Sequence, residues 1–218
     1  MTTIGLFETL LRIYGPQGWW PAGSFDELCL GAILVQNTSW NNATMALSNL
    51  GKRGLLSLPA VAEAPPEILA EALYPAGTYR RKALVIKTFS RDFSDRFKTP
   101  DTFRKRETTS ARKWLLGRKG IGHETADCIL CYGAGKPYLV IDRYTRRLAR
   151  RTGLLDEENL SYKMVQRLLQ KGLPPKATML GEFHALIVKH CKEFCGKRPS
   201  CLTCPLSANC PFPQSGGV

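Results

Sequence analysis

The chain has few acidic residues and no long hydrophobic run. Only 18 of its 218 residues are Asp or Glu, against 31 Lys or Arg, which gives a formal net charge of +13. No segment approaches the roughly 18 consecutive apolar residues of a membrane-spanning helix. The N-terminus also lacks the charged start and apolar run typical of a secretion signal. We therefore expect a cytoplasmic protein with no membrane partner.

Patterns typical of β-strands are nearly absent as well. The one candidate is the short segment YLVI at 138–141. Elsewhere apolar residues recur every three to four positions, as in amphipathic helices, and Gly- or Pro-rich breaks separate these stretches. The pattern predicts an all-α protein with helices over 4–14, 25–36, 40–50, 66–73, 79–92, 109–116, 123–132, 142–153, 161–170 and 178–191.

The surplus of positive charge indicates a polyanionic partner. Lys and Arg gain affinity for nucleic acid by releasing its condensed counterions. With 44% hydrophobic residues the chain is expected to be globular and not a disordered basic tail. The charge therefore favours a nucleic-acid-binding protein over one that binds a membrane surface or a ribosome.

Five of the eight cysteines lie between residues 191 and 210, in a segment with too few apolar residues for a core of its own. A reducing compartment disfavours disulfides, so metal ligation is the natural role. Zinc ribbons usually carry two C-x-x-C pairs, whereas this segment has one, with longer arms that suit an iron–sulfur cluster. We predict a [4Fe–4S] cluster, with zinc or unliganded thiols as alternatives. The predicted ligands, spaced by five, two and five residues, are Cys195, Cys201, Cys204 and Cys210. Cys191 is expected to be a packing residue or a thiol beside the cluster.

The stretch KGIGHETAD at 119–127 predicts a tight turn that leads into a helix near His123. Gly120 and Gly122 allow the backbone to approach a ligand, and the N–H groups at the helix start favour a phosphate. Because another short helix precedes the turn, the whole is a candidate helix-hairpin-helix, which grips the DNA backbone without reading its sequence. Arg118 and Lys119 would add charge there. An ordinary helical connection is the alternative.

An aspartate follows the next Gly/Pro loop, GAGKP at 133–137. Asp142 opens a helix, and Arg143, Arg146 and Arg147 come directly after it. By its position alone, Asp142 could simply cap the helix.

The hairpin, the GAGKP loop and Asp142 together resemble the helix-hairpin-helix-Gly/Pro-Asp superfamily of DNA glycosylases. The cysteine loop resembles that of its endonuclease III and adenine-glycosylase branches, although the first arm is one residue shorter, which leaves Cys195 the least certain ligand. Three stretches are closer to the 3-methyladenine DNA glycosylase III branch: WWPAGSFDELCLGAILVQNTSW, YPAGTYRRKA and KGIGHETADCILCYGAGKPYLVIDRY.

The resemblance implies two helical domains. Residues 22–132 would form a six-helix barrel with the hairpin, and residues 1–21 and 133–218 a second domain with the iron–sulfur loop at 195–210. A monomer would bind double-stranded DNA that contains a damaged base, with the DNA across the cleft between the domains and the base flipped into it.

The resemblance also predicts a consequence of the acidic residue in the hairpin, Glu124. Bifunctional members carry a lysine in the pattern G-I-G-x-K-T-A, where it attacks C1′ of the sugar and forms a Schiff base. Here the pattern is G-I-G-H-E-T-A, and Glu124 cannot form an imine. We therefore predict a monofunctional glycosylase, with Lys119 as the alternative Schiff-base former. Asp142 matches the catalytic aspartate, which stabilises an oxocarbenium-like sugar or orients water.

Aromatic residues match the base pocket of the 3-methyladenine branch. Trp20 and Trp40 stand where that branch stacks the flipped base, with Trp19 beside them. Alkylated purines are cationic and electron-poor, so they stack well on indole. Gln36 matches a glutamine that fills the gap left by the flipped base. His123 contacts phosphate or base, or merely begins the helix.

Two further alternatives remain open. The same fold could act on uracil, mismatched thymine or another deaminated or oxidised base, with or without strand cleavage. A protein of another class, which binds DNA through the hairpin without catalysis, is the second, and the presence of Asp142 argues against it. Tyr79 and the basic run 80–82 are expected to approach DNA or to form a solvated basic face.

Overall fold

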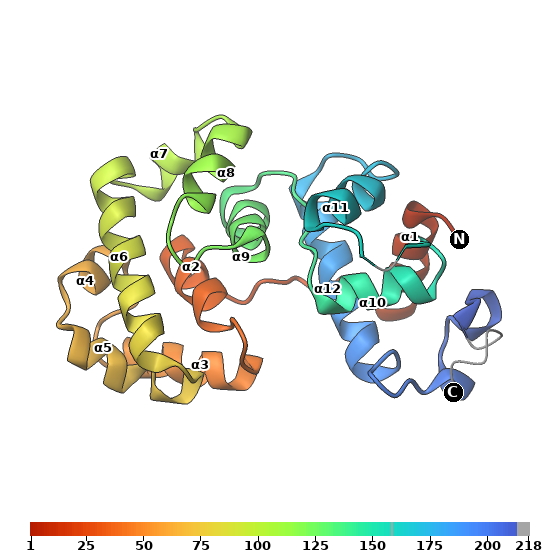
Figure 1. Cartoon of the computed structure of the whole chain (residues 1–218), viewed down its shortest axis with the longest axis horizontal. Helices are drawn as coiled ribbons and strands as arrows, with labels where there is room; N and C mark the ends of the chain where they lie inside the picture. Colours follow the sequence, from red (N-terminus) through yellow and green to blue (C-terminus); the bar gives the residue numbers. More distant parts are fainter. Residues whose placement is uncertain (158, 213–218) are drawn as a thin grey trace. The chain divides into compact units, whose positions relative to one another are not determined.

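The computed structural model describes residues 1–157 and 159–212. All regular secondary structure in this part of the chain is helical, and it contains no strand, as predicted. It divides into two compact units, one made of residues 1–19 and 136–218 (unit 1) and the other of residues 20–135 (unit 2). The helices of each unit are labelled in Figure 1.

Unit 2 is built around a helix that is hydrophobic on all sides. Eight of the ten residues of α2 (Phe25–Leu34) are buried, as expected of a helix enclosed by others. Long helix α6 (Tyr79–Phe97) packs against α2, α4 and α5. The remaining helices are α3 (Trp40–Gly51), α4 (Leu58–Glu63), α5 (Pro66–Ala72), α7 (Pro100–Arg104), α8 (Thr108–Leu116) and α9 (His123–Cys128), with a 3₁₀ turn at Tyr74–Ala76 and a π turn at Ile129–Gly133.

The sequence pattern predicted every helix of unit 2 except two short ones. Helices α4 and α7 have six and five residues, too few for apolar periodicity to show. Both begin with a proline in the first turn, preceded by a Ser or Thr cap, which is a start signal independent of periodicity. An aromatic cluster of the unit joins α6, α7 and α8, and Phe97 and Trp114 meet there edge to face, with ring centroids 4.7 Å apart.

Unit 1 is organised by α12 (Ala177–Glu193), which packs against α1 (Thr3–Tyr14) and α10 (Arg143–Arg151). Phe7 of α1 and Phe183 of α12 meet edge to face at 5.8 Å. Helix α11 (Tyr162–Gln170) and two 3₁₀ turns in the cysteine loop, Cys201–Thr203 and Ser207–Asn209, complete the unit.

The candidate strand at 138–141 is wrong: this segment is extended but has no partner strand. Side chains of α11 take the place of a neighbouring strand. Gln170 accepts a hydrogen bond from the Leu139 N–H at 2.8 Å, and Gln166 donates one to the Leu139 carbonyl at 2.7 Å. The Ile141 N–H is bonded to the hydroxyl of Tyr162 at 3.2 Å. Three backbone groups of the segment before Asp142 are satisfied in this way.

Candidate active site and cysteine loop

The predicted hairpin is present in unit 2 as α8, a tight turn and α9. Gly120 has a φ of +86°, and a Cβ at this position would lie 2.8 Å from Cγ2 of Val85, so both conformation and packing require glycine. Gly122 is the N-cap of α9, has open space around its Cα, and supplies no side-chain cap. The turn therefore presents backbone N–H groups at a helix start, which suits an anionic ligand.

The two helices of the hairpin are joined by a buried ion pair. Arg112 of α8 donates two hydrogen bonds to the carboxylate of Asp127 in α9, at 2.7 and 2.8 Å, and the Asp127 side chain is fully buried. This pair fixes the angle at which α9 leaves the turn.

Charged residues of the hairpin differ in how they are held. Lys119 is exposed. Arg118 forms an ion pair with Asp92 at 2.9 Å and lies over the ring of Trp114, so part of its charge is already neutralised within the unit. Glu124 is the second residue of α9 and is exposed, while His123 begins the helix and is half-buried. The acid expected from the sequence is thus on the surface of the first turn.

Gln36 bonds to the hairpin. Its amide nitrogen donates to the Gly120 carbonyl at 3.0 Å and to the Thr125 hydroxyl at 2.8 Å. The residue therefore braces the loop 35–39 against the turn. To fill a gap in DNA, as the resemblance suggests, its side chain would first have to leave these two partners.

Lys82 does not belong to a DNA-facing or solvated surface, and that expectation is wrong for this residue. It is 5% exposed, and its ammonium group donates to the carbonyls of Leu34 at 2.7 Å and Ala76 at 2.8 Å. Burial lowers the pKa of Lys82. The two carbonyls end α2 and the 3₁₀ turn, and each precedes a loop with a non-glycine residue at positive φ, Asn37 at 53° and Thr78 at 43°. Lys82 therefore ties together two loops in a sparsely populated backbone conformation.

Three aromatic side chains of unit 2 gather where the base pocket was predicted. Trp20 meets Trp40 edge to face, with centroids 4.9 Å apart and planes at 86°, and lies 5.7 Å from Tyr132. Because the two indoles touch each other at a right angle, no base fits between their faces in this arrangement. Both indoles are partly exposed. Trp19 belongs to unit 1.

Tyr132 was not predicted from the sequence. It lies in the π turn that extends α9, and such turns occur often at functional sites because the extra residue redirects side chains. Its apolar surroundings in the sequence made it indistinguishable from a core position.

In unit 1 the extended segment delivers Asp142 to the start of α10. Its Oδ1 accepts a hydrogen bond from the Thr145 N–H at 2.7 Å, so Asp142 does cap the helix. Its Oδ2 lies 3.6 Å from Nε2 of His184 on α12. Burial raises the pKa of Asp142, but His184 and the bonds from Thr145 outweigh burial and the pKa lies below its usual value. The aspartate is therefore held as a carboxylate.

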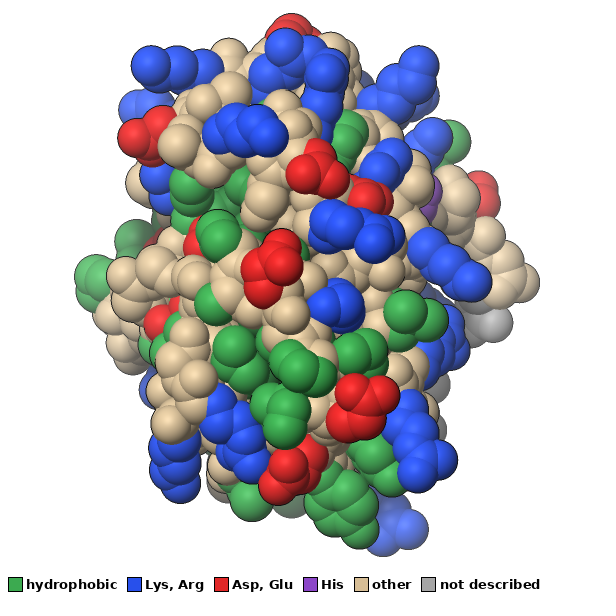
Figure 2. All heavy atoms as spheres, turned by 90° about the vertical axis from the view of Figure 1, so that its left-hand side faces the viewer, with side chains coloured by type: hydrophobic (Ala, Val, Ile, Leu, Met, Phe, Trp, Pro, Cys, Tyr) green, Lys and Arg blue, Asp and Glu red, His purple; other side chains and the backbone are tan. Residues whose placement is uncertain are grey.

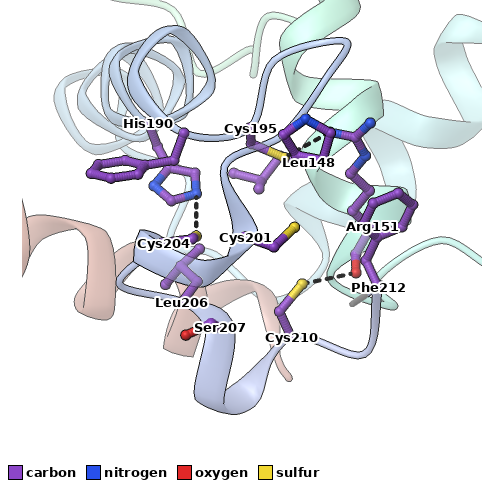
Figure 3. A pocket seen from close by; sticks show the side chains of 12 residues that line it. Leu148, Arg151, His190, Cys195, Cys201, Cys204, Leu206, Ser207, Cys210 and Phe212 are labelled. Atoms are coloured by element: carbon purple, nitrogen blue, oxygen red, sulfur yellow. Dashed lines mark hydrogen bonds between the residues drawn. The ribbon is translucent and has the colours of Figure 1, made fainter. Parts of the chain in front are cut away.

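The cysteine loop of unit 1 encloses a small pocket (Figure 3). Thiols from all four predicted ligands line it, together with Leu148, Arg151 and His190. Within the described residues no three His, Cys, Asp or Glu side chains lie close enough to hold a single metal ion. The four thiols thus line one common pocket.

Basic groups lie around this pocket. Arg151 donates to Sγ of Cys195 at 3.3 Å and to the Gly196 carbonyl at 2.7 Å, and Nε2 of His190 lies 3.6 Å from Sγ of Cys204. A hydrogen bond from Cys191, followed by those from Arg151, keeps the pKa of Cys195 below its usual value. Cys191 itself does not line the pocket, and its thiol lies 3.6 Å from the Tyr144 carbonyl.

Residues 30–175 match the family model described as HhH-GPD superfamily base excision DNA repair protein. The chain belongs to this family. It is 37% identical over 207 residues, 94% of each chain, to the putative DNA repair glycosylase MJ1434 of Methanocaldococcus jannaschii. It is 28% identical over 195 residues, 88% of this chain and 84% of the other, to endonuclease III of Thermotoga maritima. The predicted superfamily and the assignment as a DNA glycosylase of base excision repair are confirmed.

Solved structures agree with this HhH-GPD glycosylase fold. The 3-methyladenine DNA glycosylase MagIII of H. pylori, bound to 1,N6-ethenoadenine, superposes with a TM-score of 0.77 at 27% identity, over 88% of this chain and 98% of that one. Endonuclease III trapped in a covalent complex with DNA gives a TM-score of 0.83 at 18% identity over 99% of both chains, a likeness in fold. The similarity to MagIII supports the predicted 3-methyladenine branch, and the match to a family of base excision DNA repair proteins supports DNA as the partner.

One face of unit 2 carries charged side chains of both signs. On the side of unit 2 drawn in Figure 2, Lys and Arg side chains are interspersed with acidic and hydrophobic ones and form no continuous basic patch.

Among the described residues, no helix combines the length and hydrophobicity needed to cross a bilayer.

Proposed function

We propose that this glycosylase is monofunctional and hydrolyses the bond between the sugar and a damaged base, with alkylated purines as its substrate class. The observation that carries the proposal is Glu124, an exposed acid in the first turn of α9. By the family resemblance, a bifunctional enzyme has its Schiff-base lysine there. A carboxylate cannot form an imine, so water is the nucleophile.

Asp142 supports this hydrolysis. As the glycosidic bond breaks, the base leaves with the bonding electron pair and C1′ becomes cationic. The oxygen of water then bonds to C1′, and the proton it loses passes to the carboxylate and on to solvent. A carboxylate that stays ionised stabilises the developing cation, and the lowered pKa of Asp142 provides this charge at neutral pH.

The aromatic group supports alkylated purines as substrates. Trp20, Trp40 and Tyr132 form one aromatic group, and an electron-poor base would stack on it. A cationic base leaves as a neutral molecule and needs little acid assistance. The similarity to MagIII, whose structure holds 1,N6-ethenoadenine, points the same way.

DNA contacts are assigned to the hairpin and to the start of α10. The N–H groups around Gly120 and Gly122 would bind phosphate oxygens, with exposed Lys119 nearby. Arg118 would contribute less because Asp92 already pairs with it. Arg143 is exposed and follows Asp142, so its charge would lie beside the reacting nucleotide.

The four thiols that line the pocket would hold a [4Fe–4S] cluster. The donor set is chemically suitable: four cysteines line one pocket, and Arg151 offsets the negative charge that thiolates bring. The cluster would supply structure, since it ties a loop with little hydrophobic core to α10 and α12. We expect a yellow-brown purified protein with about four irons per chain. Stoichiometric zinc would overturn this assignment.

A panel of duplexes, each with one lesion, tests the function. We expect base release from methylated purines, and strand breaks only after alkali treatment. Strand cleavage without alkali would contradict the monofunctional mechanism. Release only of uracil or mismatched thymine would contradict the substrate class.

The role of Asp142 is tested with Asp142→Asn, which keeps the shape of the side chain and removes its charge. We expect a loss of base release of about 100-fold or more with DNA affinity retained. Base release at the wild-type rate would overturn the assignment.

A further inference from the structure

We propose that His184 is a positioning residue for base release: its imidazole faces the second oxygen of Asp142 and keeps that carboxylate charged and fixed in one orientation. The inference rests on the proposed role of Asp142. Neither the hairpin, the Gly/Pro loop nor the cysteine pattern points to His184.

The geometry divides the two oxygens of Asp142 between two tasks. Oδ1 is used by the helix cap, through the Thr145 N–H at 2.7 Å. Oδ2 lies 3.6 Å from Nε2 of His184, which is longer than a hydrogen bond but close enough for a strong electrostatic effect. The cap fixes one end of the carboxylate and the imidazole opposes the other, so rotation about the Cβ–Cγ bond is restricted.

Both side chains are largely excluded from solvent, with 13% of Asp142 and 8% of His184 exposed. At such a site burial alone would favour the neutral acid, which cannot stabilise a sugar cation. A nearby group that favours the anion is therefore required for the proposed chemistry. His184 supplies it from α12, whose position is fixed by packing against α1 and α10.

Other titratable groups near Asp142 do not provide this effect. Cys191, also on α12, interacts with Asp142, but its hydrogen bond with Cys195 and its burial raise its pKa, so it is a neutral thiol. Arg143 follows Asp142 on α10, and its guanidinium is bonded to the Tyr144 hydroxyl at 3.0 Å and lies over that ring. Among these titratable groups, His184 is thus the one that favours the ionised carboxylate.

The first test observes Asp142 without a substrate. The NMR signal of the side-chain carboxyl carbon of Asp142 is followed from about pH 4 to 8 in ¹³C-Asp-labelled protein. The signal is assigned by its absence in Asp142→Asn. We expect the wild-type midpoint to lie below the usual value for aspartate and His184→Ala to raise it, because burial is then less opposed. Lys189→Gln, which removes a partly exposed positive charge from the same helix, should leave the midpoint unchanged.

The second test measures the reaction under single-turnover conditions with methylated duplex DNA as the probe. In His184→Ala the rate should fall about tenfold for each pH unit below the raised midpoint and approach that of wild type at higher pH. His184→Gln, which keeps an N–H donor, should restore part of the rate. A variant that does not fold is identified by its thermal melt, and His184→Gln then carries the titration.

An unchanged Asp142 midpoint in both variants, or a rate loss equal at all pH values, would overturn the inference and leave a merely structural histidine. These results leave the proposed function intact as long as Asp142→Asn is inactive. An active Asp142→Asn would instead overturn the role of Asp142 and this inference with it.

Discussion

Arg112 and Asp127 form a two-point ion pair that locks the hairpin helices together, with nitrogen–oxygen distances of 2.7 and 2.8 Å. The pair is largely buried, and its two residues lie on α8 and α9, on either side of the predicted DNA-binding turn. It shows how the hairpin is held rigid by α8 and α9 themselves, so that the backbone groups at Gly120 and Gly122 are preorganised.

Removal of one partner of this pair should destabilise the protein strongly. Asp127→Asn leaves the Arg112 charge largely buried without its counter-charge, and we expect the free energy of unfolding to fall by about 3 kcal/mol or more. Urea denaturation measures the loss. The exposed pair Arg53–Glu71, 3.0 Å apart, offers the control, since Glu71→Gln should cost less than about 1 kcal/mol. Equal losses for the two variants would contradict the structural role assigned to the buried pair.

Glu124→Lys should bring lyase chemistry to the hairpin. The substitution restores the pattern of the bifunctional members, and we expect the variant to form a covalent complex with lesion-containing DNA when borohydride is present. Glu124→Gln, which removes the charge without adding an amine, should give none. Trapping of the wild-type protein would mean that another amine, such as Lys119, already performs this step.

Lys82→Met should weaken the two loops that Lys82 joins. The carbonyls of Leu34 and Ala76 would lose a charged donor, at a cost of about 1–3 kcal/mol in the free energy of unfolding. Hydrogen exchange should rise in residues 35–39 and 76–78. Arg81→Met, at an exposed neighbouring position, is the matched control and should change neither quantity. Unchanged exchange in both loops would argue against the clamp.

Gln166→Leu should affect base release more than its cost in stability suggests. Gln166 is bonded to the Leu139 carbonyl in the segment that delivers Asp142. We expect a loss of about 1–2 kcal/mol in stability and a lower single-turnover rate with DNA affinity retained. Leu168→Ala, at an exposed position on the same helix, should leave the rate unchanged. If both variants react at the wild-type rate, the segment does not depend on Gln166 for its position.

The cysteine loop allows a matched pair of substitutions. Cys195→Ser removes a thiol that lines the pocket and should lower iron content and visible absorption, whereas Cys191→Ser removes a nearby buried thiol outside it and should retain both. Iron analysis of the purified variants decides between them. Loss of iron from Cys191→Ser with retention in Cys195→Ser would reassign the fourth ligand.

The order of helices was readable from the sequence because apolar periodicity and capping residues act locally. Ser24, Ser39, Ser161 and Asp142 each cap the helix that follows, and their positions agree with the starts predicted from pattern. The strand candidate at 138–141 failed because β-branched and aromatic residues indicate an extended chain but not what satisfies its backbone. Here that partner comes from α11, about 30 residues further along.

What the sequence determined by itself is the family, the all-helical fold and the set of residues that can carry chemistry: the Gly-Ile-Gly turn, Glu124, Asp142 and the spaced cysteines. These signals depend on residue type and spacing along the chain. Only the tertiary structure decided that Lys82 is a buried clamp, that Gln36 braces the hairpin and that His184 faces Asp142. Burial and electrostatic pairing depend on distances between segments far apart in the chain, and those distances exist only once the helices have packed.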